Sequence, residues 1–156
     1  MAVRVRPFNK REVDLDSQCC IEMAGKMTAI IDPQTGQKKK FYFDYSYWSH
    51  DGFAVDASTG MFEKDSPSSI YCSQTNVFDD LGVEVLDNAF EGYHTCLFAY
   101  GQTGSGKSYS IFGYEKNIGI IPMACAEIFR RIELAEQDGS ETTYSVSISM
   151  LEIYNE

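Results

Sequence analysis

Leu97–Ser110 reads LFAYGQTGSGKSYS, and this stretch decides the fold of the 156-residue chain. Within it, Gly101–Ser108 fits the pattern Gly-x-x-x-x-Gly-Lys-Ser at every fixed position. The glycines permit a tight turn in which successive amide N–H groups converge on phosphate oxygens. Lys107 can then reach the β and γ phosphates, and the Ser108 hydroxyl can bind Mg²⁺. The segment therefore predicts a phosphate-binding loop for a nucleoside triphosphate.

The residues on either side of this phosphate loop (Gly101–Ser108) agree with that prediction. Thr95–Tyr100 is a short, nearly unbroken apolar run, which is typical of a buried central strand in a parallel sheet. Lys107–Phe112 can begin a helix, whose positive N-terminal end stabilises bound phosphate. The order strand, loop, helix predicts an α/β fold of the P-loop NTPase type. The alternative is a glycine-rich surface turn with no ligand.

Three further stretches accompany the loop in a characteristic order. They are Val3–Phe8 with its Arg-x-Arg-Pro signature, Phe41–Tyr45, and Leu151–Glu156. Together with Leu97–Ser110 they resemble the kinesin motor domain. In that family the three stretches correspond, in order, to the first strand, the second strand and the end of the fourth strand. Tyr47–His50 is most similar to the Unc-104-type class. The resemblance covers the whole chain.

The resemblance also shows which family elements the sequence does not contain. Neither the switch I motif (Asn-x-x-Ser-Ser-Arg-Ser-His) nor the switch II motif (Asp-Leu-Ala-Gly-x-Glu) occurs in these residues. The chain is therefore interpreted as one partial domain over residues 1–156, the N-terminal half of a kinesin motor domain. The implied fold is a central, mostly parallel sheet flanked by helices, with only its first half present.

The function implied by the resemblance is that of a microtubule-based motor. The parent would be a microtubule-stimulated ATPase of the cytoplasm and cytoskeleton, with ATP or ADP and Mg²⁺ as ligands and tubulin as partner. The 156 residues alone are expected to be inactive, because the switch residues that order the attacking water are not among them. The alternative is a truncated, catalytically silent kinesin-like interaction protein.

The site residues follow from the same resemblance. Lys107 is the candidate catalytic residue, Ser108 the metal ligand, and Tyr109 the ring that stacks on adenine. Pro7 should pack on the other side of the base, and Arg4 should lie near the ribose or the base edge. The remaining cofactor-binding candidates are the loop residues Gly101, Gln102, Thr103, Gly104, Ser105 and Gly106. Arg6 is a less favoured candidate than Arg4 for contact with the nucleotide and is assigned to the outer face of the first strand.

Composition limits the classes of partner. The formal net charge is −10, and Lys38–Lys40 is the only run of three bases, so neither nucleic acid nor a microtubule is an expected direct partner of most of this surface. The lysine run is interpreted as a solvated turn, with a tubulin contact as the alternative. No apolar run approaches the roughly 18 residues that would span a membrane. The five cysteines form no Cys-x-x-Cys pair, and with two histidines they predict reduced thiols without a metal cluster.

The secondary structure is expected to alternate strands and helices. Strands are predicted at residues 2–6, 21–32, 39–45 and 143–154, with a long loop at 46–69. One helix should run from Asn76 to Phe90, with Thr75 as its N-cap and Gly92 at its end. A second should follow the loop at residues 113–119 and run from Pro122 to Ala135.

Three motifs imitate catalytic sequences. Asn9–Glu12 resembles the guanine-binding Asn-Lys-x-Asp of GTPases, but it precedes the phosphate loop instead of following it. Asp79–Gly82 imitates a switch II Asp-x-x-Gly, but it lies inside a predicted helix. Glu152 belongs to a predicted strand away from Mg²⁺. None of them is predicted to be catalytic.

Overall fold

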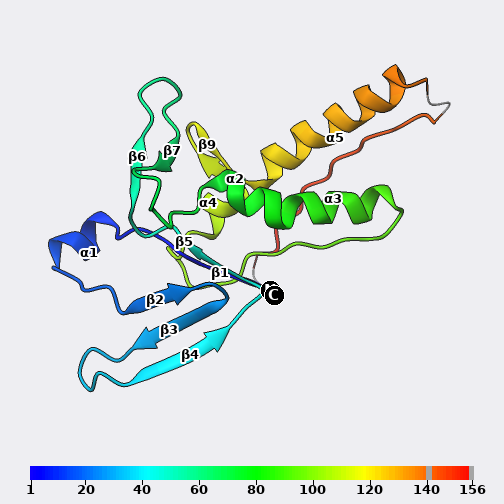
Figure 1. The fold of residues 1–156 in the computed structure, drawn as a ribbon. Helices are drawn as coiled ribbons and strands as arrows, with labels where there is room; N and C mark the ends of the chain where they lie inside the picture. Colours follow the sequence, from blue (N-terminus) through cyan, green and yellow to red (C-terminus); the bar gives the residue numbers. More distant parts are fainter. Residues whose placement is uncertain (140–141, 155–156) are drawn as a thin grey trace. The chain divides into compact units, whose positions relative to one another are not determined.

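The computed structural model describes residues 1–139 and 142–154 (Figure 1). The chain divides into two compact units, Met1–Ala124 and Cys125–Glu156. The first unit contains every strand of the described residues, the phosphate loop and the helices up to the start of α5 (Ile120–Gln137). The candidate site is therefore a property of the first unit alone.

A two-stranded parallel sheet begins the first unit. β1 (Ala2–Val5) pairs with β5 (Tyr45–Trp48), so that Arg4 lies opposite Tyr47. Tyr47 is buried, and its hydroxyl donates a hydrogen bond of 3.1 Å to Asp80 Oδ2. Asp80, the residue after the first aspartate of the imitation Asp-x-x-Gly motif, thus binds a core tyrosine.

The antiparallel sheet comprises β2 (Ile21–Ala24), β3 (Met27–Ile31) and β4 (Lys38–Tyr42). The predicted strand at 21–32 is divided by a turn between Ala24 and Met27. Lys38–Lys40 lies in β4 and not in a turn, so the prediction of a solvated turn is wrong. The three side chains remain exposed on an edge strand, where lysine discourages further strand pairing.

The predicted loop at 46–69 is also wrong, because it contains a hairpin. β6 (Phe53–Val55) pairs antiparallel with β7 (Phe62–Lys64). The Phe53 ring lies 5.1 Å from the Phe62 ring and 5.1 Å from the Tyr71 ring, measured between centroids. Aromatic packing across the hairpin therefore stabilises the two strands, although the turn-rich sequence does not indicate them.

The helical segments follow the sequence pattern closely. α1 (Lys10–Asp14) follows β1. α2 (Gln74–Val77), a π-helical turn η1 (Phe78–Gly82) and α3 (Val83–Phe90) run on from one another, confirming the predicted helix. Its N-cap is Ser73 and not Thr75, because the Ser73 side chain accepts from the Asn76 N–H. α4 (Lys107–Ile111) follows the phosphate loop, a hairpin of β8 (Gly113–Tyr114) and β9 (Asn117–Ile118) comes next, and α5 begins two residues before Pro122.

The predicted central strand at Thr95–Tyr100 is absent from the structure. This segment is coil after α3, with Phe98 79% and Tyr100 95% exposed (Figure 1). The strands of the described residues form four small separate sheets instead of one central sheet. A buried strand needs hydrogen-bonding neighbours on its edges, and no strand in the part of the chain described here pairs with this segment.

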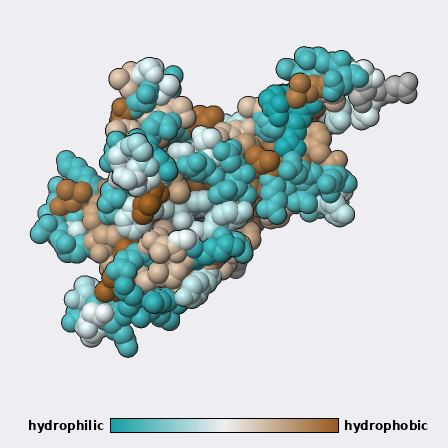
Figure 2. Space-filling model, viewed as in Figure 1, coloured by the Kyte–Doolittle hydropathy of each residue, from teal (hydrophilic) through white to brown (hydrophobic). Residues whose placement is uncertain are grey.

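The second unit, considered by itself, holds most of α5 and a coil. Residues 142–154 form no strand, and Leu151 is 91% exposed, so the half-exposed strand predicted at 143–154 is wrong for the described residues. Residues 155–156 of the predicted strand end lie outside the described range. Figure 2 shows apolar residues scattered among hydrophilic ones on the face in view. Within residues 1–139 and 142–154, no helix combines the length and apolar character that a membrane span requires.

Candidate functional site

The phosphate loop turns directly into α4. Gly106 is the N-cap residue of α4 and has φ of +99°, a left-handed conformation that favours glycine. The Ser105 N–H donates to the Gln102 carbonyl at 3.1 Å, which closes the turn, and the Ser110 N–H donates to the Gly106 carbonyl at 3.0 Å. The backbone therefore has the tight bend that the glycine spacing predicts.

The Lys107 ammonium is held by the loop to which it belongs. Its Nζ donates to the carbonyl oxygens of Gly101 at 2.7 Å and Gln102 at 2.9 Å. These carbonyls hold the cation across the turn, where a phosphate oxygen could replace them as its partner. The half-buried side chain thus places a positive charge within the loop.

Ser108 lies in the first turn of α4 and is exposed. In the described residues, no group of three or more His, Cys, Asp or Glu side chains could hold a metal ion. The Ser108 hydroxyl is thus one side-chain oxygen that could contact a Mg²⁺ ion bound beside the phosphate loop. An oxygen ligand suits Mg²⁺, which keeps several waters in nucleotide sites.

A cavity of about 560 Å³ lies in the first unit beside the phosphate loop. The nucleotide-site candidates that line it are Arg4, Pro7, Ser105, Gly106, Lys107 and Tyr109. Apolar side chains of Leu97–Tyr100 and aromatic side chains of the β6–β7 hairpin line it as well. The cavity therefore joins charged phosphate-loop groups to a largely apolar wall, a combination found in small-molecule sites.

The structure places Arg4 beneath the Tyr109 ring. The Arg4 guanidinium carbon lies 5.3 Å from the ring centroid, within cation–π range. Its N–H groups donate to Ser49 Oγ at 2.9 Å, Gln74 Oε1 at 2.5 Å and Ser110 Oγ at 3.2 Å. Burial lowers the pKa of Arg4, and the same burial raises the pKa of the Tyr109 phenol. Arg4 therefore supports the predicted stacking ring, with its own hydrogen bonds made to the protein.

Gln74 is a site residue that the sequence analysis missed. Its side chain is only 4% exposed, and its Nε2 donates to the carbonyls of Tyr109 at 2.6 Å and Asn117 at 3.2 Å. The side-chain oxygen of Gln74 accepts a hydrogen bond from Arg4. Gln74 therefore connects the first turn of α2 to α4 and to the β8–β9 hairpin. A polar residue in the first turn of a helix ordinarily lies at the surface, so the sequence offers no signal for this role.

The loop, the helix that follows it and the adjacent cavity have the arrangement expected of a P-loop protein. The family model of the kinesin motor domain matches residues 4–156, and the chain belongs to the kinesin family.

Individual relatives agree with this assignment. The chain is 49% identical over 157 residues to rat kinesin-like protein KIF28 and 47% identical over 161 residues to rat KIF1A, with all of the chain covered in both cases. The predicted relationship to Unc-104-type kinesins is confirmed, because KIF28 and KIF1A are relatives of that class. The chain spans 15% of the KIF28 relative and 8% of the KIF1A relative.

A solved structure is similar to most of this chain. The motor domain of KIF14, residues 391–755 with ADP in complex with a microtubule, matches 85% of the chain with a TM-score of 0.71 and 42% identity. The chain covers 33% of that structure. The present fold is therefore a part of the kinesin motor fold.

We expect Gln74→Leu to lower the free energy of unfolding of a complete motor domain by about 1–3 kcal/mol. Leucine fills a similar volume but leaves the buried groups of Arg4 and the Tyr109 carbonyl without their partner. Chemical denaturation measures this loss. The protein to be used is this chain extended through the switch motifs with sequence from a kinesin relative, which is called the complete motor domain below. Gln34→Leu, at an exposed turn, is the matched control and should change stability by less than about 0.5 kcal/mol. Equal stability of the two variants would contradict a linking role for Gln74.

Proposed function

We propose that this chain binds ATP and ADP with Mg²⁺ and is the nucleotide-docking part of a microtubule motor. The observation that carries the proposal is the complete phosphate loop joined to α4, with the Lys107 ammonium held within the loop. Membership of the kinesin family and the ADP-bound KIF14 motor domain support the same ligand class.

The phosphates would be bound by the backbone amides of the phosphate loop and by Lys107, which we propose as the catalytic residue of this chain. Ser108 would contribute one oxygen to Mg²⁺, which neutralises phosphate charge when bound. Phosphoryl transfer depends on positioning and electrostatic stabilisation, so these groups would act by fixing the chain of phosphates and its charge. Hydrolysis also needs groups that order water, and the family's switch motifs for this task do not occur in the sequence.

The adenine would stack on Tyr109, whose other face is supported by Arg4. Pro7 lines the same cavity as Tyr109, which supports the proposal that it covers the second side of the base. Microtubule binding would belong to other elements of the motor, because the net charge of this chain is −10 and microtubule surfaces are acidic.

Tyr109→Ala should weaken ADP binding to the complete motor domain by about 1–3 kcal/mol, the magnitude typical of base–aromatic stacking. Tyr109→His should have little effect, because imidazole offers a similar flat face. Equilibrium titration with a fluorescent ADP analogue measures both. Tyr42→Ala, at an exposed ring on β4, is the matched control. Unchanged affinity in both Tyr109 variants would remove the stacking assignment, and the Pro7 assignment with it.

The alternative function is a catalytically silent kinesin-like interaction protein. The sequence of the encoding transcript would distinguish it from a motor. Coding sequence that continues beyond Glu156 into Ser-Ser-Arg and Asp-Leu-Ala-Gly motifs would identify part of a motor. A stop codon at that point would favour the silent protein.

A further inference from the structure

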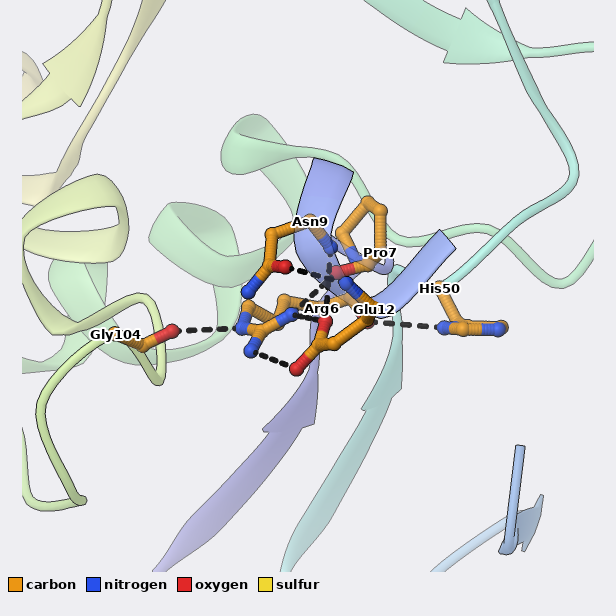
Figure 3. Close-up of polar contacts among 6 residues, drawn as sticks. All are labelled: Arg6, Pro7, Asn9, Glu12, His50 and Gly104. Carbon is orange, nitrogen blue, oxygen red and sulfur yellow. Dashed lines mark hydrogen bonds and ion pairs between the residues drawn. The ribbon is translucent and has the colours of Figure 1, made fainter. Parts of the chain in front are cut away.

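The side chain of Arg6 connects the phosphate loop to α1 (Figure 3). Arg6 follows β1 directly, and its Nε donates to the Gly104 carbonyl at 2.7 Å. Its Nη1 and Nη2 donate to Glu12 Oε2 at 2.7 Å and to Glu12 Oε1 at 2.8 Å. The side chain therefore does not serve the outer face of the strand, to which the sequence analysis assigned it.

Glu12 is itself fixed by the capping box of α1. The Asn9 side chain accepts from the Glu12 N–H at 2.9 Å, and the Asn9 N–H donates to Glu12 Oε2 at 2.8 Å. The segment that imitates a guanine-binding motif is thus a helix cap. Hydrogen bonds from Arg6 first, and then from the Asn9 backbone, lower the pKa of Glu12 to about 2. The ion pair is therefore complete at neutral pH and is lost only as pH falls below the ordinary value of 4.5 towards 2.

The backbone of Arg6 is anchored from the opposite side. Its carbonyl is hydrogen-bonded to His50 Nδ1 at 3.0 Å. The His50 ring packs edge-on against Phe8, with centroids 4.6 Å apart, and against Trp48 at 5.4 Å. Nη1 of Arg6 also donates to the Pro7 carbonyl at 2.7 Å. Both ends of the arginine are therefore held while its Nε contacts the phosphate loop.

The contact with Gly104 constrains the direction of a loop amide. In a trans peptide the C=O and the following N–H point in opposite directions. The Gly104 carbonyl turns towards Arg6, and the Ser105 N–H of the same peptide points away from Arg6, to the Gln102 carbonyl at 3.1 Å. Gly104 has φ of +78°, and a glycine can rotate to other conformations easily unless its peptide is held. Here the N–H is held by the Gln102 carbonyl within the loop, and the carbonyl is held from outside the loop by Arg6.

We propose that the Arg6–Glu12 pair is a positioning device for the phosphate loop, which sets the Gly104–Ser105 peptide before nucleotide binds. The inference rests on the proposed nucleotide-binding function. Four N–H bonds of Arg6 are directed at protein oxygens, and the pair has no net charge. Arg6 therefore acts through the loop and not as a phosphate ligand.

Two conservative variants separate positioning from folding. Glu12→Gln keeps a side-chain oxygen for the Asn9 N–H, so the cap of α1 is retained while the ion pair is lost. Arg6→Lys keeps the positive charge but cannot bind Gly104 and both Glu12 oxygens together. Glu22→Gln is the matched control, because it removes the ion pair between Glu22 and Lys38 on the β2–β4 sheet.

In the complete motor domain, both Arg6→Lys and Glu12→Gln should weaken ADP binding roughly tenfold, and Arg6→Ala with Glu12→Ala should be no worse than Arg6→Ala alone. Amide hydrogen exchange in the nucleotide-free protein should accelerate at Ser105 and Gly106, with the melting temperature nearly unchanged. Glu22→Gln should alter neither measurement.

Three results would overturn the inference. Wild-type ADP affinity in both conservative variants, with the unaltered protein still binding ADP, would remove the positioning role and leave the proposed function intact. Weaker binding in Glu12→Ala but not in Glu12→Gln would assign the effect to the helix cap. Failure of the unaltered protein to bind ADP would overturn the proposed function and this inference with it.

Discussion

Lys107→Ala should lower the ATPase rate of the complete motor domain at least about 100-fold, comparable to the loss of a group that stabilises developing charge. Lys107 is the only cationic side chain of the phosphate loop, and its ammonium is already held across the turn by the Gly101 and Gln102 carbonyls. ADP affinity should fall less, because the backbone amides remain and ADP lacks the γ phosphate. Steady-state phosphate release and ADP titration measure the two effects.

Lys116→Ala is the matched control for this prediction. Lys116 is exposed in the turn between β8 and β9, so its removal changes net charge equally without touching the phosphate loop. Its ATPase rate should equal that of the unaltered motor domain. Normal turnover in Lys107→Ala would contradict the assignment of Gly101–Ser108 as the phosphate-binding loop.

A second large effect is expected in the segment Thr95–Tyr100. In the 156-residue chain its amides should exchange with solvent as in an unfolded peptide, because the segment is exposed coil. In the complete motor domain they should be protected by several orders of magnitude, as in buried strands of a sheet. Hydrogen exchange followed by mass spectrometry or NMR makes this comparison directly.

The same reasoning predicts that the 156-residue chain alone has no Mg²⁺-dependent ATPase and tends to aggregate. Unpaired backbone groups and exposed apolar side chains such as Phe98 and Leu151 make isolated strand segments prone to association. A monomeric 156-residue protein that melts cooperatively and hydrolyses ATP would show this prediction to be wrong.

Local features of the fold could be predicted from the sequence. The helix that ends near Gly92 and the tight bend at Gly101–Ser108 depend on neighbouring residues and agree with the sequence pattern, whereas the strand predicted at 21–32 is divided into β2 and β3. The strand at Thr95–Tyr100 could not be predicted in this way, because strand structure depends on distant partners whatever the apolar pattern of the segment. An apolar run indicates what a segment can bury, and a partner must be present for burial to occur.

The candidate site likewise combines residues that a local sequence pattern indicates with residues that it does not. The phosphate-loop residues can be proposed from the sequence because their spacing is fixed by phosphate geometry. The Asn9–Glu12 capping box was readable from an Asn followed three residues later by a Glu, but its comparison with a GTPase motif concealed that signal. The roles of Gln74 and Arg6 depend on contacts with residues 35 and 98 positions away, respectively, and no local pattern announces them.

The position of Arg4 has a consequence for which bases the motor would accept. Its N–H groups bind Ser49, Gln74 and Ser110, and another faces the Cys72 carbonyl, so the guanidinium is not available to read the edge of a base. If Tyr109 provides the stacking surface, selection rests on the flatness and area of the ring system, which adenine and guanine share. Arg4 would then not be a group that distinguishes adenine from guanine, and any preference between the two purines would have to come from other groups around the base edge.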